Sequence, residues 1–331
     1  MSDVRWGRRD TVAWLGLLLV GCGTRGPAGG APPGTPPAGQ SPGAGPSIKD
    51  ALGTVTLPGV ASRVVALEWT YAEDLLAVGL QPIGVADVAG YRKWVNVAPA
   101  LAPEVAEVGT RQEPNLEAIT RLKPDLIVGV KFRHEVIRDR LREIAPTLIF
   151  DPYPPPGGPD QYQEMETTFL AIGEAVGRRE AGVAVLQQLQ AGFSQAAARL
   201  KAAGHEGREF VLTQAYTANN APQLRLFLDN AMVVQLMTRL GLRNAWKADF
   251  DIYGFSTVGV EALATVERAS LFYAVQDDDN VFASQLKDHP VWRNLTFVKE
   301  GRTYPLGGNT WLFGGPLSAQ LVAEKVVSLL A

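Results

Sequence analysis

Short apolar segments alternate with amphipathic segments along most of this chain, and this alternation constrains the fold more than any other feature. Segments 63–67, 125–130 and 147–150 are rich in Val, Leu and Ile and are bounded by turn-forming or charged residues. Continuous apolar strands connected through helices are typical of a parallel sheet that helices cover on both faces. The sequence therefore predicts an α/β fold with Rossmann-like, doubly wound organisation.

A long helical pattern separates this alternation into two parts. Residues 178–204 have apolar positions at spacings of three and four and contain no proline. At 1.5 Å per residue such a helix would be about 35–40 Å long. This length suits a spacer between two lobes, and packing on the sheet of a single domain is the alternative. We expect one lobe at 48–177, a connecting helix at 178–204 and a second lobe at 205–331.

The first 47 residues have the composition of an exported and tethered segment. Three arginines precede an apolar stretch that is too short to span a bilayer, which is the order of a secretory signal. The stretch ends at Gly21-Cys22 and resembles a bacterial lipobox, which implies cleavage before Cys22 and a lipid on its thiol. We expect a signal peptide at 1–21 and, at 22–47, the lipidated cysteine followed by a disordered linker rich in proline and glycine.

The predicted anchor would hold the protein at the cell membrane on the extracytoplasmic side, in a periplasm or at the cell surface. A short membrane anchor is the alternative, and export by the general or by the twin-arginine route stays open. Beyond the signal, no segment has about 18 consecutive apolar residues, so the sequence predicts no transmembrane helix after processing.

Composition excludes several functional classes. The formal net charge of −3 at pH 7 provides no basic surface for nucleic acid. Cys22 is the single cysteine, so no internal disulfide is possible. The three histidines are scattered, without the spacing of a metal site. A hydrolase on the same α/β plan is an alternative of a different class, but no nucleophile, base and acid form a recognisable trio. A lipoprotein that only scaffolds partners is a further alternative.

Eight segments, in this order, resemble the iron–siderophore substrate-binding lipoproteins of bacterial ABC importers, above all the ferric-hydroxamate type. These proteins form part of the periplasmic binding proteins with a helical backbone, and the resemblance covers residues 48–331. The segments are RVVALEW (63–69), AEDLLAVGLQPIGVAD (72–87), YRKWVN (91–96), VGTRQEPNLEAI (108–119), LKPDLIVG (122–129), IAPT (144–147), YGFSTVGVE (253–261) and WLFGGPLSA (311–319).

The resemblance implies two Rossmann-like α/β lobes joined by one long rigid helix, with the ligand cleft between the lobes. It implies a monomeric binding protein, not an enzyme, that captures a ferric siderophore and delivers it to an ABC permease for iron uptake. The siderophore alone would hold the Fe³⁺, so we expect no cofactor and no protein metal ligands. A catecholate siderophore, cobalamin or haem is the alternative ligand within the same class.

The resemblance also indicates ligand contacts. Arg111 lies in a loop after a predicted strand, and its guanidinium group matches the iron-bound oxygens of a hydroxamate or carboxylate. Trp94, Tyr253 and Trp311 match aromatic residues that line the cleft in this family. The weaker aromatic candidates are Phe255 and Phe313.

This chain departs from the ferrichrome-type pattern at one place. It has Lys131-Phe132-Arg133 where those proteins have a tyrosine after the strand. Lys131, Arg133 and Arg225 would add cations to the cleft, which suits a mixed citrate–hydroxamate siderophore better than neutral ferrichrome. Solvated surface positions for these three side chains are the alternative.

Two stretches of the chain are similar to each other, and each contains one carboxylate to which the family resemblance assigns permease docking. Glu117 and Glu261 occupy equivalent places in two similar stretches, each at the start of a helix and before a strand. In the family that this chain resembles, one such Glu on each lobe meets arginines of the permease. Helix capping, which the helix dipole favours for negative charge, is the alternative.

Overall fold

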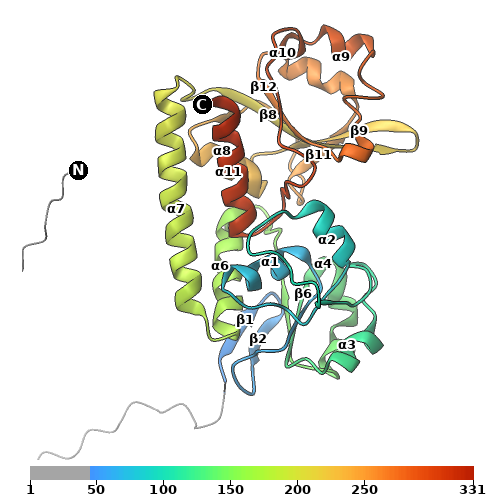
Figure 1. Ribbon diagram of the computed structural model, residues 1–331, viewed down its shortest axis with the longest axis vertical. Helices are drawn as coiled ribbons and strands as arrows, with labels where there is room; N and C mark the ends of the chain where they lie inside the picture. The colour runs from blue at the N-terminus through green and yellow to red at the C-terminus, as the bar shows by residue number, and fades with distance from the viewer. Residues whose placement is uncertain (1–44) are drawn as a thin grey trace, which may run out of the picture. The chain divides into compact units, whose positions relative to one another are not determined.

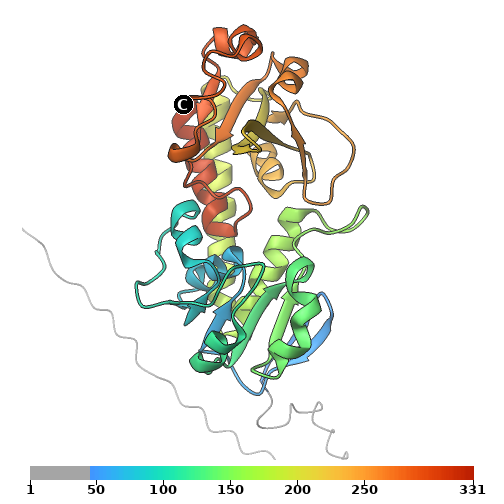
Figure 2. The same cartoon turned by 90° about the vertical axis from the view of Figure 1, so that its right-hand side faces the viewer.

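Two sheets lie at opposite ends of the folded part of the chain, and a long helix runs beside both (Figures 1 and 2). The computed structural model describes residues 45–331. The predicted signal peptide, Cys22 and nearly all of the linker lie outside the described residues. The predicted α/β fold class with two lobes is confirmed.

The first lobe is built on a parallel sheet of five strands in the order β5-β4-β3-β6-β7. Its strands β3 and β6 consist of buried residues only, as expected for a sheet covered on both faces. The order reverses beside β3, and such a reversal places a crevice at the carboxyl ends of the strands. The strands are β3 (Val64–Ala66), β4 (Gly84–Val85), β5 (Ala106–Glu107), β6 (Leu126–Val130) and β7 (Thr147–Phe150).

Helices and one hairpin complete this lobe. The β1–β2 hairpin (Ser47–Asp50, Gly53–Thr56) precedes the sheet. The helices are α1 (Trp69–Ala77), α2 (Val88–Trp94), α3 (Leu116–Leu122), α4 (Lys131–His134), η1 (Glu135–Ile137) and α5 (Arg138–Arg142).

The second lobe is built on a mixed sheet in the order β11-β9-β8-β12-β13, with β10 beside β8. Strands β10, β8, β12 and β13 are parallel, whereas β9 runs antiparallel to both β8 and β11. The strands are β8 (Glu209–Ala218), β9 (Ala221–Phe227), β10 (Arg243–Asn244), β11 (Phe255–Val258), β12 (Ser270–Ala274) and β13 (Thr303–Pro305). Its helices are α8 (Met232–Arg239), η2 (Val260–Val266), η3 (Asp277–Asp279), α9 (Pro290–Asn294), α10 (Thr296–Lys299) and α11 (Pro316–Leu330).

The second lobe contains an antiparallel hairpin, β8–β9, which the alternation of strands and helices in the sequence does not predict. Strand β8 is ten residues long and ends at Ala218. Asn219 and Asn220 then reverse the chain with φ values of 50° and 59°. Asparagine tolerates this left-handed region better than most residues, so an Asn-Asn pair can close a two-residue hairpin.

Helices α6 (Gln161–Ala175) and α7 (Arg179–Ala202) connect the lobes. The 24 residues of α7 give a length of about 36 Å. Its N-terminal half contacts the core of the first lobe through Leu186, and Leu189, Phe193 and Leu200 belong to a core of the second lobe. Helix α7 also packs against α6 and α11, so both lobes share its surface. Among residues 45–331, no helix combines the length and the apolar character that crossing a membrane requires.

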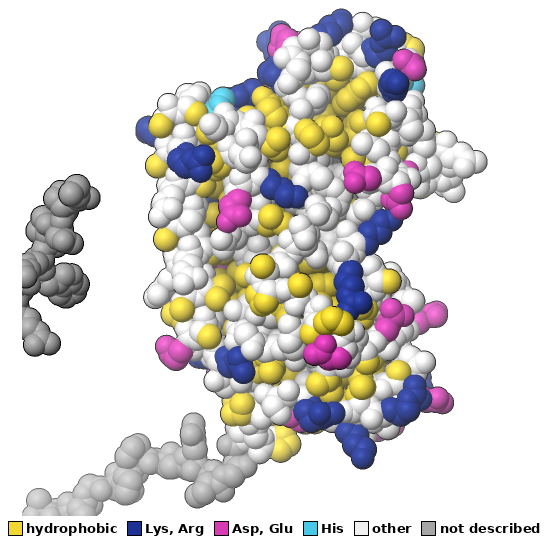
Figure 3. Space-filling view, in the orientation of Figure 1, with side chains coloured by type: hydrophobic (Ala, Val, Ile, Leu, Met, Phe, Trp, Pro, Cys, Tyr) yellow, Lys and Arg dark blue, Asp and Glu magenta, His cyan; other side chains and the backbone are white. Residues whose placement is uncertain are grey.

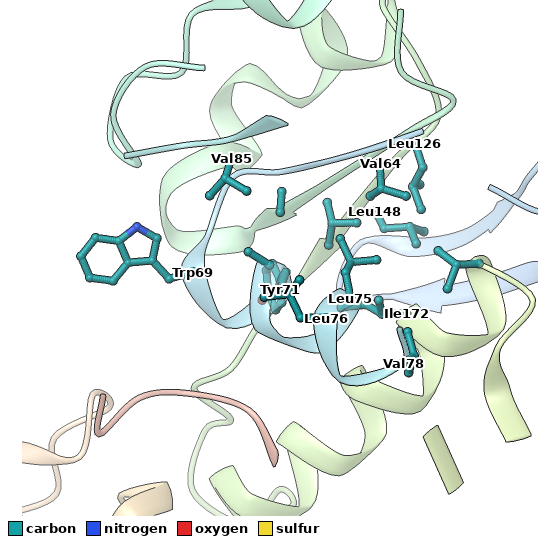
Figure 4. Packing of buried hydrophobic residues seen from close by; sticks show 14 of the residues in the cluster. Val64, Trp69, Tyr71, Leu75, Leu76, Val78, Val85, Leu126, Leu148 and Ile172 are labelled. Atoms are coloured by element: carbon teal, nitrogen blue, oxygen red, sulfur yellow. The ribbon is translucent and has the colours of Figure 1, made fainter. Parts of the chain in front are cut away.

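The core of the first lobe fixes the orientation of α1. Leu75, Leu76 and Val78 pack against strand residues such as Val64 and Leu148 (Figure 4). In Figure 4 the indole of Trp69 lies apart from these side chains, at the start of α1. At the start of α1, Trp69 and Thr70 contact the segment before α11, whereas Tyr71 and the last turns of α1 are held in the core of the first lobe.

Candidate ligand-binding site

A cavity of about 440 Å³ lies between the lobes, within the usual size range of small-molecule sites. Figure 3 shows the surface hollowed between the two lobes, with Lys or Arg side chains along the border. Residues from α1, α6, β9 and the segment before α11 line the cavity, together with the loops after β5 and β7. Seven of the nine predicted ligand contacts are among these lining residues: Arg111, Arg133, Arg225, Tyr253, Phe255, Trp311 and Phe313.

The backbone of Arg111 is held by a buried histidine. His134 Nδ1 accepts a hydrogen bond of 2.9 Å from the Val130 N–H, so the ring proton lies on Nε2. Nε2 then donates to the carbonyl oxygen of Arg111 over 2.8 Å. Burial lowers the pKa of His134, which favours this neutral form. The side chain of Arg111 therefore enters the cavity from a loop that His134 fixes to the end of β6.

The guanidinium group of Arg111 is fixed on one side and has unused donors on the other. Its Nη1 donates to Glu68 Oε1 over 2.8 Å. The guanidinium carbon lies 3.6 Å from the ring centroid of Trp69, in cation–π contact. Nε is buried and lies 3.9 Å from Asp87 Oδ2, beyond hydrogen-bond distance. The Arg111 side chain is 16% exposed and lines the cavity, so the accessible part of the guanidinium group can donate to an anionic ligand atom.

Glu68 joins two of the predicted ligand-contacting arginines. It lies directly before α1, and its second carboxylate oxygen accepts a hydrogen bond from Arg133 Nη1. Its side chain is only 9% exposed. One negative charge therefore offsets part of the positive charge that Arg111 and Arg133 bring to the cavity. Glu68 was not among the residues predicted from the sequence. Its position just after a buried strand could have indicated it, because the carboxyl ends of parallel strands line ligand crevices.

The second lobe contributes a third arginine to the cavity. Arg225 on β9 donates from Nη1 to Gln214 Oε1 over 3.1 Å. Its guanidinium carbon lies 4.8 Å from the ring centroid of Phe255 and 5.0 Å from that of Tyr216. Its Nε is buried and has no hydrogen-bond partner in the described part of the chain. Both lobes therefore contribute arginine side chains to the lining of the same cavity.

Aromatic side chains form two walls of the cavity. Trp311 contacts Trp69 at a centroid distance of 4.9 Å and Phe313 at 5.2 Å. At the mouth, Tyr253 of the second lobe is 40% exposed and meets Phe132 at 5.9 Å and Tyr153 at 5.1 Å. Phe132 and Tyr153 come from the first lobe and were not among the predicted ligand contacts. Such walls supply apolar contact area for a chelate.

Two predicted ligand contacts do not line the cavity. Trp94 is half-buried and lies behind Trp311, at a centroid distance of 6.1 Å. The ammonium group of Lys131 lies 3.3 Å from Oδ2 of Asp151, the residue that follows β7, and the two side chains form an ion pair. Neither Trp94 nor Lys131 is therefore placed among the residues that line the cavity.

The two predicted docking carboxylates are exposed. The Glu117 side chain is 92% exposed in the first turn of α3, 4.0 Å from Arg121. Glu261 is exposed in the first turn of η2. Helix η2 packs against α9, and α9 and α3 lie at opposite ends of the molecule (Figure 1). Neither carboxylate reaches the cavity.

The described residues offer no ready metal site of their own. Among residues 45–331, no three or more His, Cys, Asp and Glu side chains are grouped so that they could hold a metal ion. Both ring nitrogens of His134 are engaged within the protein, so this histidine is not free to ligate haem iron.

Comparisons with known proteins agree with this geometry. Residues 64–310 match the family described as "Periplasmic binding protein". The Fe(3+)-citrate-binding protein YfmC of Bacillus subtilis is 29% identical over 281 residues, which cover 85% of this chain and 84% of that protein. The iron(3+)-hydroxamate-binding protein FhuD of Escherichia coli is 28% identical over 258 residues, which cover 78% of this chain and 83% of that protein.

A solved structure has the same arrangement. The siderophore-binding protein FhuD from Vibrio cholerae, determined with bound Fe³⁺–Desferal, superposes with a TM-score of 0.73 at 27% identity. The superposition covers 81% of this chain and 97% of that protein.

Proposed function

Because the chain belongs to the family of periplasmic binding proteins, we propose that it captures a ferric siderophore outside the cytoplasm and delivers it to an ABC permease. The ligand is a hydroxamate or a mixed citrate–hydroxamate siderophore, whose oxygens coordinate the Fe³⁺. The protein binds the outside of this chelate and carries out no chemistry on it. Relatives that bind ferric citrate and ferric hydroxamate support this ligand class.

The observation that carries the proposal is the position of the Arg111 guanidinium. It is fixed by Glu68 and Trp69, lies within 3.9 Å of Asp87, and still lines the cavity with a side chain that is 16% exposed. Hydroxamate and carboxylate oxygens bound to iron keep negative charge, and a guanidinium group donates to such oxygens with charge-assisted hydrogen bonds. The aromatic walls from both lobes enclose the organic part of the chelate.

The charge of the cavity favours chelates of modest negative charge. Glu68 and Asp87 offset part of the charge of Arg111 and Arg133, while Arg225 forms no ion pair with any of residues 45–331. A neutral or weakly anionic hydroxamate or citrate–hydroxamate chelate matches this balance. A highly anionic tris-catecholate would meet Glu68 as well as the arginines, and therefore fits less well.

Tryptophan fluorescence tests the ligand class, because Trp311 lines the cavity and Trp69 lies against Arg111. Titration with ferric schizokinen, a citrate–hydroxamate chelate, and with ferric Desferal, a trihydroxamate, should quench the emission with sub-micromolar Kd. The iron-free siderophores should have little effect. Saturation by cobalamin or by a ferric catecholate, without binding of either hydroxamate chelate, would overturn the proposal.

Docking to the permease uses Glu117 and Glu261. Their exposure, and their helices at opposite ends of the molecule, support one acidic contact per lobe. Changing both residues to Lys should leave the Kd of the chelate unchanged and impair iron uptake by cells. The same change at Glu143, another exposed glutamate of the first lobe, serves as the control. Normal iron uptake by the double variant would contradict the docking role, and the two carboxylates would then only stabilise the starts of their helices.

The anchor resides at Cys22, where the preceding residues resemble a lipobox. Lipoprotein names among the relatives support it, for example the probable siderophore-binding lipoprotein YfiY of Bacillus subtilis. Cys22→Ser should move the protein from the membrane fraction to the soluble fraction without changing the Kd of the chelate. Retention of the variant in the membrane fraction would contradict a lipid anchor at this residue.

A further inference from the structure

The exposed apolar side chains of this protein gather at one edge of the cavity. Six large hydrophobic side chains are exposed among residues 45–331, and five of them come from the two segments that meet at the mouth. Exposed apolar residues that are scattered singly are ordinary, whereas a group at one place marks an interaction site. We call this group the mouth strip; its members are Phe132, Val136, Phe250, Ile252 and Tyr253, and the sixth exposed residue, outside it, is Val60.

The mouth strip has one rim on each lobe. On the first lobe, Phe132 and Val136 are four residues apart across α4 and η1, so they lie on the same side of this helical stretch. On the second lobe, the carbonyl oxygen of Ile252 accepts a hydrogen bond of 3.1 Å from Gln161, a residue that lines the cavity. The two rims meet where the rings of Phe132 and Tyr253 contact each other at a centroid distance of 5.9 Å.

The strip continues the wall of the cavity outward. Phe132 and Tyr253 belong to both surfaces, because they line the cavity and are also exposed to solvent. Val136 and Ile252 do not line the cavity, and Val136 is 90% exposed. The apolar surface therefore begins inside the space between the lobes and extends to the outside of the molecule.

The opposite edge of the cleft has a different chemical character. There, Lys93 Nζ of α2 lies 2.7 Å from Asp278 Oδ2 of η3, so an exposed ion pair joins the two lobes. In Figure 2, α2 (teal) lies on one side of the cleft, and the segment after β7 (light green), which carries Tyr153, lies on the other. Tyr153 contacts Tyr253 of the strip. An apolar substituent of a bound ligand thus meets charges at one edge and a matching surface at the other.

We propose that the mouth strip binds an apolar chain, such as a fatty-acyl group, that the ferric chelate carries. This inference rests on the proposed function. The iron-bound oxygens meet Arg111 in the cavity, while the chain leaves past Phe132 and Tyr253 and lies along Val136 and Ile252. Burial of its methylene groups against these side chains supplies the affinity. A ligand chain is favoured over a partner protein as the occupant, because the two rings at which the strip begins also line the ligand cavity.

A series of ferric chelates that differ only in chain length tests the strip. The terminal amine of Desferal is acylated with an acetyl, octanoyl or dodecanoyl group, which changes the chain and leaves the iron site and the charge the same. The wild-type protein should bind the dodecanoyl form about 10-fold to 100-fold more tightly than the acetyl form, with the octanoyl form between them. Fluorescence titration below the concentration at which micelles form measures the three Kd values. Equal values would overturn the inference.

A double variant identifies where the chain lies. Val136→Ser together with Ile252→Ser shortens the apolar strip and leaves the residues that line the cavity unchanged. It should bind the acetyl form as the wild type does, and its preference for the dodecanoyl form should fall to within about threefold. Val60→Ser, at the exposed apolar residue outside the strip, is the matched control and should keep the full preference. An undiminished preference in the double variant, or an equal loss in the control, would overturn the inference.

The acetyl form separates this inference from the proposed function. If the acetyl form binds and chain length has no effect, only the inference fails. If no form binds, the proposed ligand class fails, and the inference fails with it. Iron uptake by cells from the acetyl form tests for a protein occupant instead. Impaired uptake by the double variant, at an unchanged Kd and with no loss of the chain-length preference, would assign the strip to the permease and overturn chain binding.

Discussion

Ser318 donates two hydrogen bonds to Glu73, from its backbone N–H to Oε1 over 2.7 Å and from its hydroxyl to Oε2 over 2.6 Å. Glu73 lies on α1 of the first lobe, and Ser318 lies in the first turn of α11, which packs in the second lobe. The Glu73 side chain is fully buried, and burial raises its pKa while the bonds from Ser318 lower it. The two lobes therefore meet in a buried polar contact next to the cavity.

Removal of this carboxylate should destabilise the fold. In Glu73→Ala, the buried N–H and hydroxyl of Ser318 lose their acceptor, and we expect the free energy of unfolding to fall by about 2–4 kcal/mol. Glu73→Gln keeps an acceptor for the N–H and should cost less. Urea denaturation measures both values. A loss below about 1 kcal/mol for the alanine variant would show that water replaces the contact.

Binding should depend on Arg111 and not on Lys131. Arg111→Ala removes the donors that face the cavity, and we expect the Kd of ferric Desferal to rise about 10-fold to 100-fold. Lys131→Ala removes a cation that pairs with Asp151 outside the cavity, so its Kd should stay within about twofold of the wild type. Fluorescence titration gives both values. Equal losses in the two variants would place Lys131 at the ligand after all.

The carboxylate of Glu68 should limit affinity for anionic chelates. Glu68→Gln keeps an acceptor for one of the two arginines, turns an amide donor toward the other, and removes one negative charge from the cavity wall. We expect tighter binding of an anionic ferric citrate–hydroxamate chelate, by about threefold to tenfold, which corresponds to about 1 kcal/mol. A neutral trihydroxamate chelate should change less. If the variant binds both chelates as weakly as Arg111→Ala, Glu68 acts mainly by positioning the arginines.

The contribution of His134 to stability should fall in mild acid. Burial lowers its pKa from the usual 6.5, so below about pH 6.5 the unfolded chain takes up a proton at this residue that the folded protein does not. This contribution to the free energy of unfolding therefore decreases as the pH falls through this range, until the lower pKa of the folded state is reached, whereas buried carboxyls with raised pKa values, such as Glu73, act in the opposite direction. His134→Gln should be less stable at pH 7 and should show a shallower pH slope, measured by urea denaturation at several pH values.

The sequence was informative where local pattern decides structure. The buried strands at 125–130 and 147–150, the long helix and the loop that bears Arg111 all follow from apolar runs and spacing, and the structure has them. The β8–β9 hairpin was missed because its turn is Asn219-Asn220 instead of a glycine turn. Contacts between distant residues were also missed. Nothing local indicates that Glu68 meets Arg133, 65 residues away, or that Lys131 finds Asp151.

The three rings at the mouth of the cavity, Phe132, Tyr153 and Tyr253, have a consequence for selectivity. In the ligand-free protein they contact one another at centroid distances of 5.1–5.9 Å, and each such pair contributes about 0.5–1.5 kcal/mol. A chelate that passed between these rings would break those contacts and would have to replace them with its own surface. A broad chelate that touches all three rings recovers this energy, and a compact one does not. The three rings at the mouth thus favour chelates that are wide enough to contact all of them, whatever charge the chelate carries.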